Sequence, residues 1–134
     1  MAGLGGDSHP LRTADDIIKA RRLVRDCAVA HGLPLVDQTK LVTAASELAR
    51  NTLVHGGGGD MRIESLEDGG RRGVKVLFED QGPGIDDIDL ALKDGYSTGG
   101  GLGLGLGGAK RLVDDFHIQS KPGKGTIVTI VRWK

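Results

Sequence analysis

The first half of the chain carries its apolar side chains at helical spacing. Thr13 and Asp16 stand three residues apart, as in a helix-capping box, and apolar residues then recur every three or four positions up to about His31. A second helix is predicted from Pro34, a favourable first-turn residue, to the glycine run 56–59. Its predicted buried face consists of Leu41, Ala44, Ala45, Leu48 and Thr52. The two segments therefore indicate a pair of amphipathic helices.

The second half of the chain changes to a strand-like pattern. Residues 61–66 and 74–78 flank an Asp-Gly-Gly turn, and apolar and polar residues alternate along the second of them, as in a β-hairpin. Residues 117–121 and 126–133 flank a Pro-Gly-Lys-Gly turn and predict a second hairpin. A third helix, running through Val113, is expected between the hairpins. This order predicts an α+β fold, a two-layer sandwich in which about three helices cover a mainly antiparallel mixed sheet.

Length and composition indicate one ordinary globular domain. The 134 residues suffice for a single domain, expected over residues 13–134 after a loose leader at residues 1–12. Eighteen Lys and Arg residues balance 18 Asp and Glu residues, so no net positive charge attracts nucleic acid. Cys27 is the only cysteine and no apolar run is long enough to span a membrane. We therefore expect a cytoplasmic protein whose partners include neither nucleic acid nor membrane.

The most unusual feature of the composition is glycine, with 23 residues that are most densely placed in residues 95–108. Glycine has no side chain to shield its backbone N–H group, and such exposed N–H groups ahead of a helix bind phosphate groups well. A flexible linker is the alternative, but leucines interrupt the run at even spacing, and Lys110 and Arg111 follow it in the predicted helix. The run contains the spacing G-x-G-x-x-G without the preceding strand of a dinucleotide-binding fold, and it lacks the Gly-Lys-Ser/Thr of a P-loop. It therefore indicates a different nucleotide-binding fold.

Two polar residues lie one turn apart on the second predicted helix. Glu47 and Asn51 are four positions apart, so their side chains rise from the same helix face. A glutamate there could accept a proton, and the amide oxygen of an asparagine is a neutral ligand suited to Mg²⁺. His55, one turn further, is interpreted as structural.

A second candidate group ends the first predicted hairpin. Asp80 follows an apolar strand and precedes Gly82 and Gly84. A carboxylate at this point can accept a hydrogen bond from the exocyclic amine of adenine. The two glycines allow the chain to turn and to approach a ring without Cβ clashes. On its own, the same pattern would also fit a simple turn.

The order of these motifs resembles that of a known family. Glu47 and Asn51, the Asp80 motif, the glycine-rich run and a final Gly-Lys-Gly-Thr ending at Thr126 follow one another as in the Bergerat ATP-binding fold of the GHKL superfamily. Within it, the segments SELARN, DQGPGI and DGYSTGGGLGLGLGGAKRLVDDF are similar to those of the RsbT-type switch kinases of bacterial stress signalling. The resemblance covers essentially all of residues 13–134.

The resemblance implies a role for each motif. Glu47 matches the catalytic general base, Asn51 the magnesium ligand at the ATP site, and Asp80 the residue that reads adenine. Gly82 and Gly84 match the turn beneath the base, and Thr126 matches a threonine that fixes the adenine-reading carboxylate by hydrogen bonding. The lid over the ATP phosphates is matched by Gly99, Gly100, Gly101, Leu102, Gly103, Leu104 and Gly105. We expect the whole glycine-rich segment from Gly95 to Gly108 to be mobile without nucleotide and to become ordered when nucleotide binds.

The resemblance also implies a function. It predicts a serine/threonine protein kinase that uses ATP and Mg²⁺ and acts as a regulatory switch in a sigma-factor pathway. Its expected partners are a STAS-domain antagonist, which it phosphorylates, and a PP2C-type phosphatase, which it binds when released; close relatives hold a sigma factor directly. The alternative is a nucleotide-gated binding module with negligible turnover, such as an anti-sigma factor or a phosphatase activator. A sensor histidine kinase core and a gyrase-like ATPase are less favoured, because the chain has neither a phosphoacceptor helix nor a transducer domain.

Overall fold

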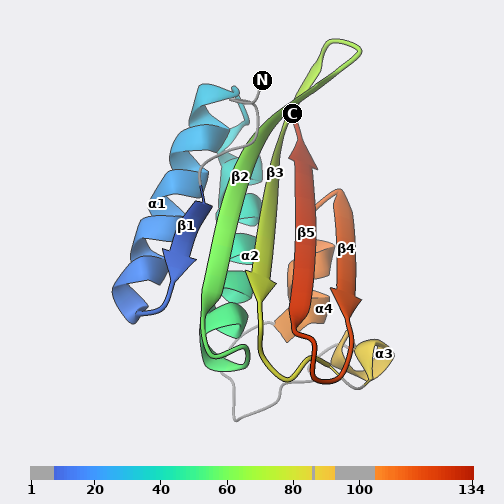
Figure 1. The fold of residues 1–134 in the computed structure, drawn as a ribbon. Coiled ribbons are helices and arrows are strands. Elements are labelled where there is room, and N and C mark those ends of the chain that lie inside the picture. Colours follow the sequence, from blue (N-terminus) through green and yellow to red (C-terminus); the bar gives the residue numbers. More distant parts are fainter. Residues whose placement is uncertain (1–7, 86, 93–104) are drawn as a thin grey trace.

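The protein forms two layers, with a sheet on one side and helices on the other (Figure 1). The computed structural model describes residues 8–85, 87–92 and 105–134. In chain order the elements are β1 (Ser8–Leu11), α1 (Ala14–Ala30), α2 (Leu35–Val54), β2 (Gly59–Asp68), β3 (Arg71–Asp80), α3 (Ile88–Ala91), α4 (Gly105–Arg111), β4 (Asp115–Ser120) and β5 (Thr126–Trp133). The five strands are ordered β1-β2-β3-β5-β4. The expected α+β sandwich is confirmed, and every strand pairing in the described part of the chain is antiparallel.

Helix α1 begins at the predicted capping box. The backbone N–H of Asp16 donates to the Thr13 hydroxyl at 3.2 Å, and the backbone N–H of Thr13 donates to the Asp16 carboxylate at 3.1 Å. The backbone N–H of Arg12 donates to the same carboxylate at 2.8 Å and lowers the pKa of Asp16. These bonds satisfy N–H groups that have no partner within the helix.

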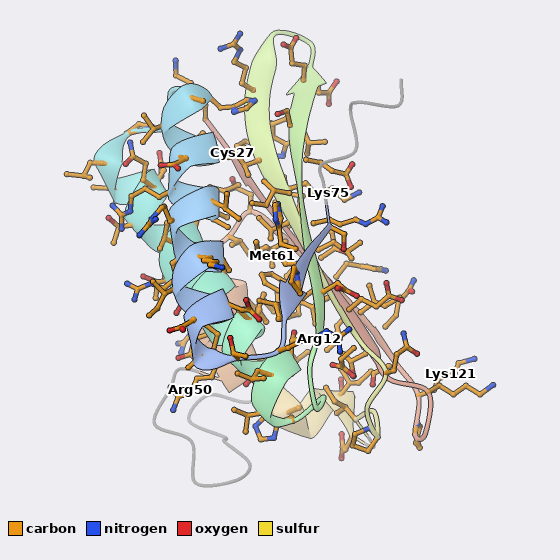
Figure 2. All side chains as sticks on the ribbon, turned by 60° about the vertical axis from the view of Figure 1, so that its left-hand side comes forward. Arg12, Cys27, Arg50, Met61, Lys75 and Lys121 are labelled. Atoms are coloured by element: carbon orange, nitrogen blue, oxygen red, sulfur yellow. The ribbon has the colours of Figure 1, made fainter. Side chains whose placement is uncertain are left out.

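The core lies between the sheet and the two long helices. Phe78 of β3 faces Met61 of β2, and both side chains are buried. Helix α2 supplies Leu41 and Leu48 from the predicted apolar face, and both are buried as well. Figure 2 shows Met61 between the sheet and the helices. The apolar residues of the strand pattern, with period two, and of the helix pattern, with period 3.6, therefore pack together in one core. None of the described helices is long and apolar enough to cross a lipid bilayer.

The first hairpin brings β2 and β3 together through a two-residue turn. Gly69 and Gly70 have φ angles of 58° and 90°, and Asp68 pairs with Arg71. Two successive positive φ angles are the mark of a type I′ turn, whose twist matches that of the strands. The turn fixes the register by which β3 ends at Asp80.

The structure differs from the sequence prediction near the N-terminus. Residues Ser8–Leu11, expected to belong to a loose leader, form an edge strand that pairs with β2. The side chain of Leu11 is completely buried, and this burial fixes a segment whose composition gave no strand pattern.

Helix α4 is shorter than predicted. It spans seven residues and ends before Leu112 and Val113, which were expected to belong to it. The backbone N–H of Leu112 instead donates to the carbonyl of Ala109 at 3.1 Å, a tightened turn that directs the chain into β4.

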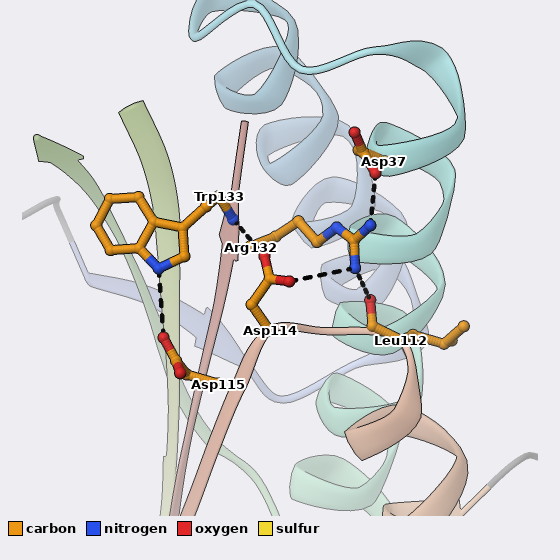
Figure 3. A network of polar contacts seen from close by, with 6 residues as sticks. All are labelled: Asp37, Leu112, Asp114, Asp115, Arg132 and Trp133. Atoms are coloured by element: carbon orange, nitrogen blue, oxygen red, sulfur yellow. Dashed lines mark hydrogen bonds and ion pairs between the residues drawn. The ribbon is translucent and has the colours of Figure 1, made fainter. Parts of the chain in front are cut away.

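A polar network joins the end of β5 to the helix layer (Figure 3). The guanidinium of Arg132 lies 2.5 Å from the carboxylate of Asp37 at the start of α2, and it donates to the carbonyl of Leu112 after α4 at 3.3 Å. Asp114 adds a longer ion pair at 3.8 Å and accepts the backbone N–H of Trp133 at 2.7 Å. Arg132 therefore holds α2, the end of α4 and β5 in fixed relation.

We expect Asp37→Ala to lower the free energy of unfolding by about 1–3 kcal/mol, because it removes a charge-assisted hydrogen bond from a largely buried guanidinium. Urea unfolding would measure this loss. The matched control is the same change on an Arg132→Met background, where it should cost much less because its partner is already gone. Equal costs on both backgrounds would contradict a stabilising role for the pair.

Trp133 lies at the opposite end of β5 from Thr126. Its ring packs on Gly73 of the neighbouring strand, where a Cβ atom would lie 2.6 Å from the ring. The guanidinium carbon of Arg71 lies 4.8 Å from the ring centroid, and the indole N–H donates to Asp115 at 3.4 Å. Contacts from two strands therefore hold the indole in place.

Candidate functional site

A cavity opens where α2 and β3 end and β5 begins. These ends of the three elements lie toward the bottom of Figure 1. Its volume is about 420 Å³. This size lies within the range of small-molecule sites, about 300–1,000 Å³. The side chains that project from α2 and from both strands therefore share a space large enough for a ligand.

Several predicted site residues meet at this cavity. Those that line it are Asn51, Asp80, Gly84, Gly105 and Thr126. Gly82 lies next to the cavity, and its backbone N–H donates to a carboxylate oxygen of Asp80 at 2.9 Å. Glu47 is half-buried one turn before Asn51 on α2, and it is not among the described residues that line the cavity. The predicted lid residues 99–104 lie outside the described residues, so the structure leaves their role a prediction.

Asp80 is the one buried carboxylate among the described residues. It is 8% exposed and stands in a wall that is otherwise largely apolar. The apolar lining residues include Leu48, Phe78, Ile85, Leu106 and Val128. A largely apolar space with a buried carboxylate in its wall suits a heteroaromatic ring that carries an amine, because the ring buries apolar area and the amine pairs with the carboxylate.

The loop after Asp80 packs directly on the β4–β5 turn. A Cβ on Gly84, whose φ is 79°, would lie 2.1 Å from the carbonyl oxygen of Lys121. The backbone N–H of Gly123 donates to the carbonyl of Pro83 at 2.7 Å. Glycine at position 84 is therefore required both by its backbone conformation and by the close approach of the two loops.

Ser120 is a site residue that the sequence analysis missed. Its hydroxyl accepts the backbone N–H of Ile85 at 2.8 Å and lies 2.8 Å from the hydroxyl of Thr126. In the described part of the chain, the Thr126 hydroxyl is thus bonded to Ser120, and no hydrogen bond joins it to Asp80. The available signal was the alternation of β4, in which Ser120 is a polar residue on the inward face after Phe116 and Ile118.

Two further residues at the end of α2 line the cavity. His55, interpreted as structural, lies in the cavity wall one turn after Asn51. Gly56, interpreted only as the start of a helix-ending run, lines the wall as well. No spacing in the sequence indicated that His55 lines the same cavity as Asp80 or that Gly56 lies against the Asp80 side chain.

The residues present fit a magnesium nucleotide. Mg²⁺ that accompanies a nucleotide keeps several waters and takes one or two protein ligands together with the phosphates. Asn51 offers one such oxygen at the cavity. Within residues 8–85, 87–92 and 105–134 there is no group of three or more His, Cys, Asp or Glu side chains that could hold a metal alone. Among the described residues, Asn51 therefore offers the kind of single oxygen ligand that a nucleotide-borne cation takes from a protein.

Known proteins resemble the chain in sequence and in fold. Residues 36–134 match the family model described as "Histidine kinase-, DNA gyrase B-, and HSP90-like ATPase". The chain is 47% identical over 123 residues to the serine/threonine-protein kinase RsbT of Bacillus subtilis (strain 168), covering 92% of each chain. It is 28% identical over 120 residues to the anti-sigma F factor of Thermoanaerobacter sp. (strain X514), covering 85% of this chain and 82% of that one.

A solved structure shows the same fold. The crystal structure of the RsbU and RsbW domains of Rv1364c from Mycobacterium tuberculosis matches with a TM-score of 0.63 at 21% identity. The match covers 94% of this chain and 31% of that one. At this identity the likeness extends to the fold alone.

Proposed function

Because the chain belongs to the family of histidine kinase-, DNA gyrase B- and HSP90-like ATPases, we propose that it is an ATP-dependent serine/threonine protein kinase that acts as a regulatory switch. The observation that carries this proposal is 47% identity, over 92% of both chains, to a protein named as a serine/threonine kinase. The apolar cavity with Asp80 in one wall and Asn51 in another supports ATP as the phosphate donor.

In this proposal each part of the site has its own task. Asp80 accepts a hydrogen bond from the adenine amine, and the apolar wall covers the ring. Asn51 holds Mg²⁺, which when bound neutralises charge on the phosphates. Glu47 accepts the proton of the acceptor hydroxyl as its oxygen bonds to the γ-phosphorus and the bond to ADP breaks. The resemblance assigns residues 99–105 the task of covering the phosphates.

The proposed partners are proteins of a sigma-factor pathway. We assign a STAS-domain antagonist as the phosphate acceptor and a PP2C-type phosphatase as the partner bound after release, with the cytoplasm as the location. These assignments rest on the resemblance to the RsbT-type kinases, and relatives named as anti-sigma factors support the pathway.

A binding module with negligible turnover is the second candidate. It is favoured by the relatives named as anti-sigma factors, one of them 28% identical over 120 residues. In such a protein the nucleotide would change the affinity for a sigma factor or a phosphatase without being consumed.

One experiment separates the two candidates. The protein is mixed with γ-labelled ATP, Mg²⁺ and a STAS-domain protein encoded beside it, and the label on serine is measured together with the affinity of the complex. Label on serine that is lost in the Asn51→Ala variant supports the kinase. Nucleotide-dependent binding without transferred label supports the binding module and contradicts the kinase.

The role of Asp80 predicts a preference for ATP over GTP, because guanine presents a carbonyl where adenine presents its amine. We expect Asp80→Ala to weaken ATP binding by roughly ten- to a hundredfold, the cost of one charge-assisted hydrogen bond. The same change should affect GTP far less. Calorimetry with both nucleotides measures the effect, and equal affinities of the unaltered protein for ATP and GTP would contradict this role.

A further inference from the structure

Gly56, the second residue after α2, lies against the side chain of Asp80. A Cβ atom on Gly56 would stand 2.4 Å from Cγ of Asp80 and 2.5 Å from both its Cβ and its Oδ2. Carbon atoms in contact are normally about 3.5–4.0 Å apart. The φ angle of Gly56 is not among the positive ones, so its backbone conformation does not itself require glycine. Glycine is therefore needed at position 56 to leave space for the Asp80 carboxylate.

The same residue touches the loop that follows Asp80. A Cβ on Gly82 would lie 2.8 Å from both Cα and the carbonyl oxygen of Gly56, so the two glycine backbones are in direct contact. Gly82 also donates its N–H to the Asp80 carboxylate at 2.9 Å. Gly56 thus borders both the carboxylate and the backbone group that orients it.

Gly56 is tied in turn to the helix that carries Asn51. Its backbone N–H donates to the carbonyl oxygen of Asn51 at 3.1 Å, as part of the turn that ends α2. Gly56 therefore lies between Asn51 and Asp80. It is hydrogen-bonded to Asn51 and contacts the side chain of Asp80.

We propose that Gly56 is a positioning residue for base recognition, which sets the place of the Asp80 carboxylate relative to α2. This inference rests on the proposed function, since it concerns the part of the site assigned to adenine. A methyl group at position 56 displaces the carboxylate from its place beside the Gly82 N–H. The amine of adenine then loses its acceptor, whereas the magnesium end of the site keeps Asn51.

The test is Gly56→Ala, with Kd measured by calorimetry for Mg²⁺-ATP and for Mg²⁺-GTP. We expect ATP binding to weaken by roughly tenfold or more and GTP binding to change much less. The ratio of ATP affinity to GTP affinity should therefore fall toward the ratio measured for Asp80→Ala. On an Asp80→Gly background, which has no side chain for the methyl to meet, the added methyl should leave the ratio unchanged. A wild-type ratio in Gly56→Ala would overturn the inference.

Gly57→Ala is the matched control. Gly57 has a φ of 74° and nothing within 4 Å of an added Cβ, so alanine there strains the backbone without touching Asp80. We expect a lower Tm and an unchanged ratio of ATP to GTP affinity. If the ratio of ATP to GTP affinity fell equally in Gly56→Ala and Gly57→Ala, general destabilisation would explain the effect. That result would overturn the inference.

Two further outcomes are distinguishable. If the unaltered protein itself does not prefer ATP, the proposed role of Asp80 fails before the Gly56 variant is considered. If Gly56→Ala does not fold, the double variant Gly56→Ala/Asp80→Gly should fold, because it has no side chain at position 80 for the methyl to meet. Failure of that rescue would show that the contact with Asp80 is not the cause and would overturn the inference.

Discussion

Replacement of Glu47 by alanine is expected to slow phosphate transfer to the partner protein by about 10²–10⁴-fold while ATP remains bound. The reason is the position of Glu47, which lies one turn from Asn51 on α2 but is not part of the described cavity lining. Its carboxylate would accept a proton during phosphate transfer without contacting the adenine ring of ATP. Single-turnover transfer from labelled ATP gives the rate, and calorimetry gives the affinity.

Glu47→Gln is the control for this prediction. Glutamine keeps the size and the hydrogen-bonding ability of the side chain but cannot act as a base at neutral pH. It should therefore be nearly as slow as alanine. Transfer at the wild-type rate in either variant would remove Glu47 from the role of base, and loss of ATP binding in Glu47→Ala would assign it to the nucleotide instead.

Replacement of Asn51 by alanine is expected to abolish the part of ATP affinity that depends on Mg²⁺. The amide oxygen of Asn51 is the proposed protein ligand, and the described part of the chain holds no group of three or more His, Cys, Asp or Glu side chains that could bind a metal alone. Binding is measured by calorimetry with Mg²⁺ and with a chelator. The residual affinity of the variant should equal that of the unaltered protein without metal.

Arg50 provides the matched control for Asn51. Its side chain is exposed and projects away from the core at the same end of α2 (Figure 2). Arg50→Ala should therefore keep the full magnesium effect. Equal affinities of the unaltered protein with and without Mg²⁺, or a magnesium effect that survives in Asn51→Ala, would contradict the assignment.

The fold was predictable where local pattern and tertiary structure agree. The capping box at Thr13, the apolar face of α2 and the Gly69-Gly70 turn all lie where the sequence placed them. The position of β5 was not predictable, because it enters the sheet between β3 and β4. That placement depends on which long-range strand pairing buries the most side-chain area. The spacing of residues along the chain does not determine this strand order. The order nevertheless decides the site, since it sets Thr126 opposite Asp80.

The site was predictable for residues in motifs and not for those that act through contacts. Asn51 and Asp80 line one cavity, and their roles there stay predictions. Similarity to a serine/threonine kinase confirms the expected class of protein. Gly56 and Ser120 were missed, because each matters only through residues that are distant in the chain. A glycine that ends a helix and a glycine that makes room for a carboxylate are identical in sequence.

The packing of Trp133 determines what an optical experiment on this protein can report. Trp133 is the chain's only tryptophan, so all indole fluorescence comes from the end of β5 held by Gly73 and Arg71. Thr126 and the cavity lie at the other end of that strand, roughly 23 Å away at the usual rise per residue. Its emission should therefore follow the melting of the sheet and stay constant while nucleotide enters the cavity. Tryptophan emission can thus report the unfolding of the protein, while nucleotide binding must be followed by a signal from the ligand itself.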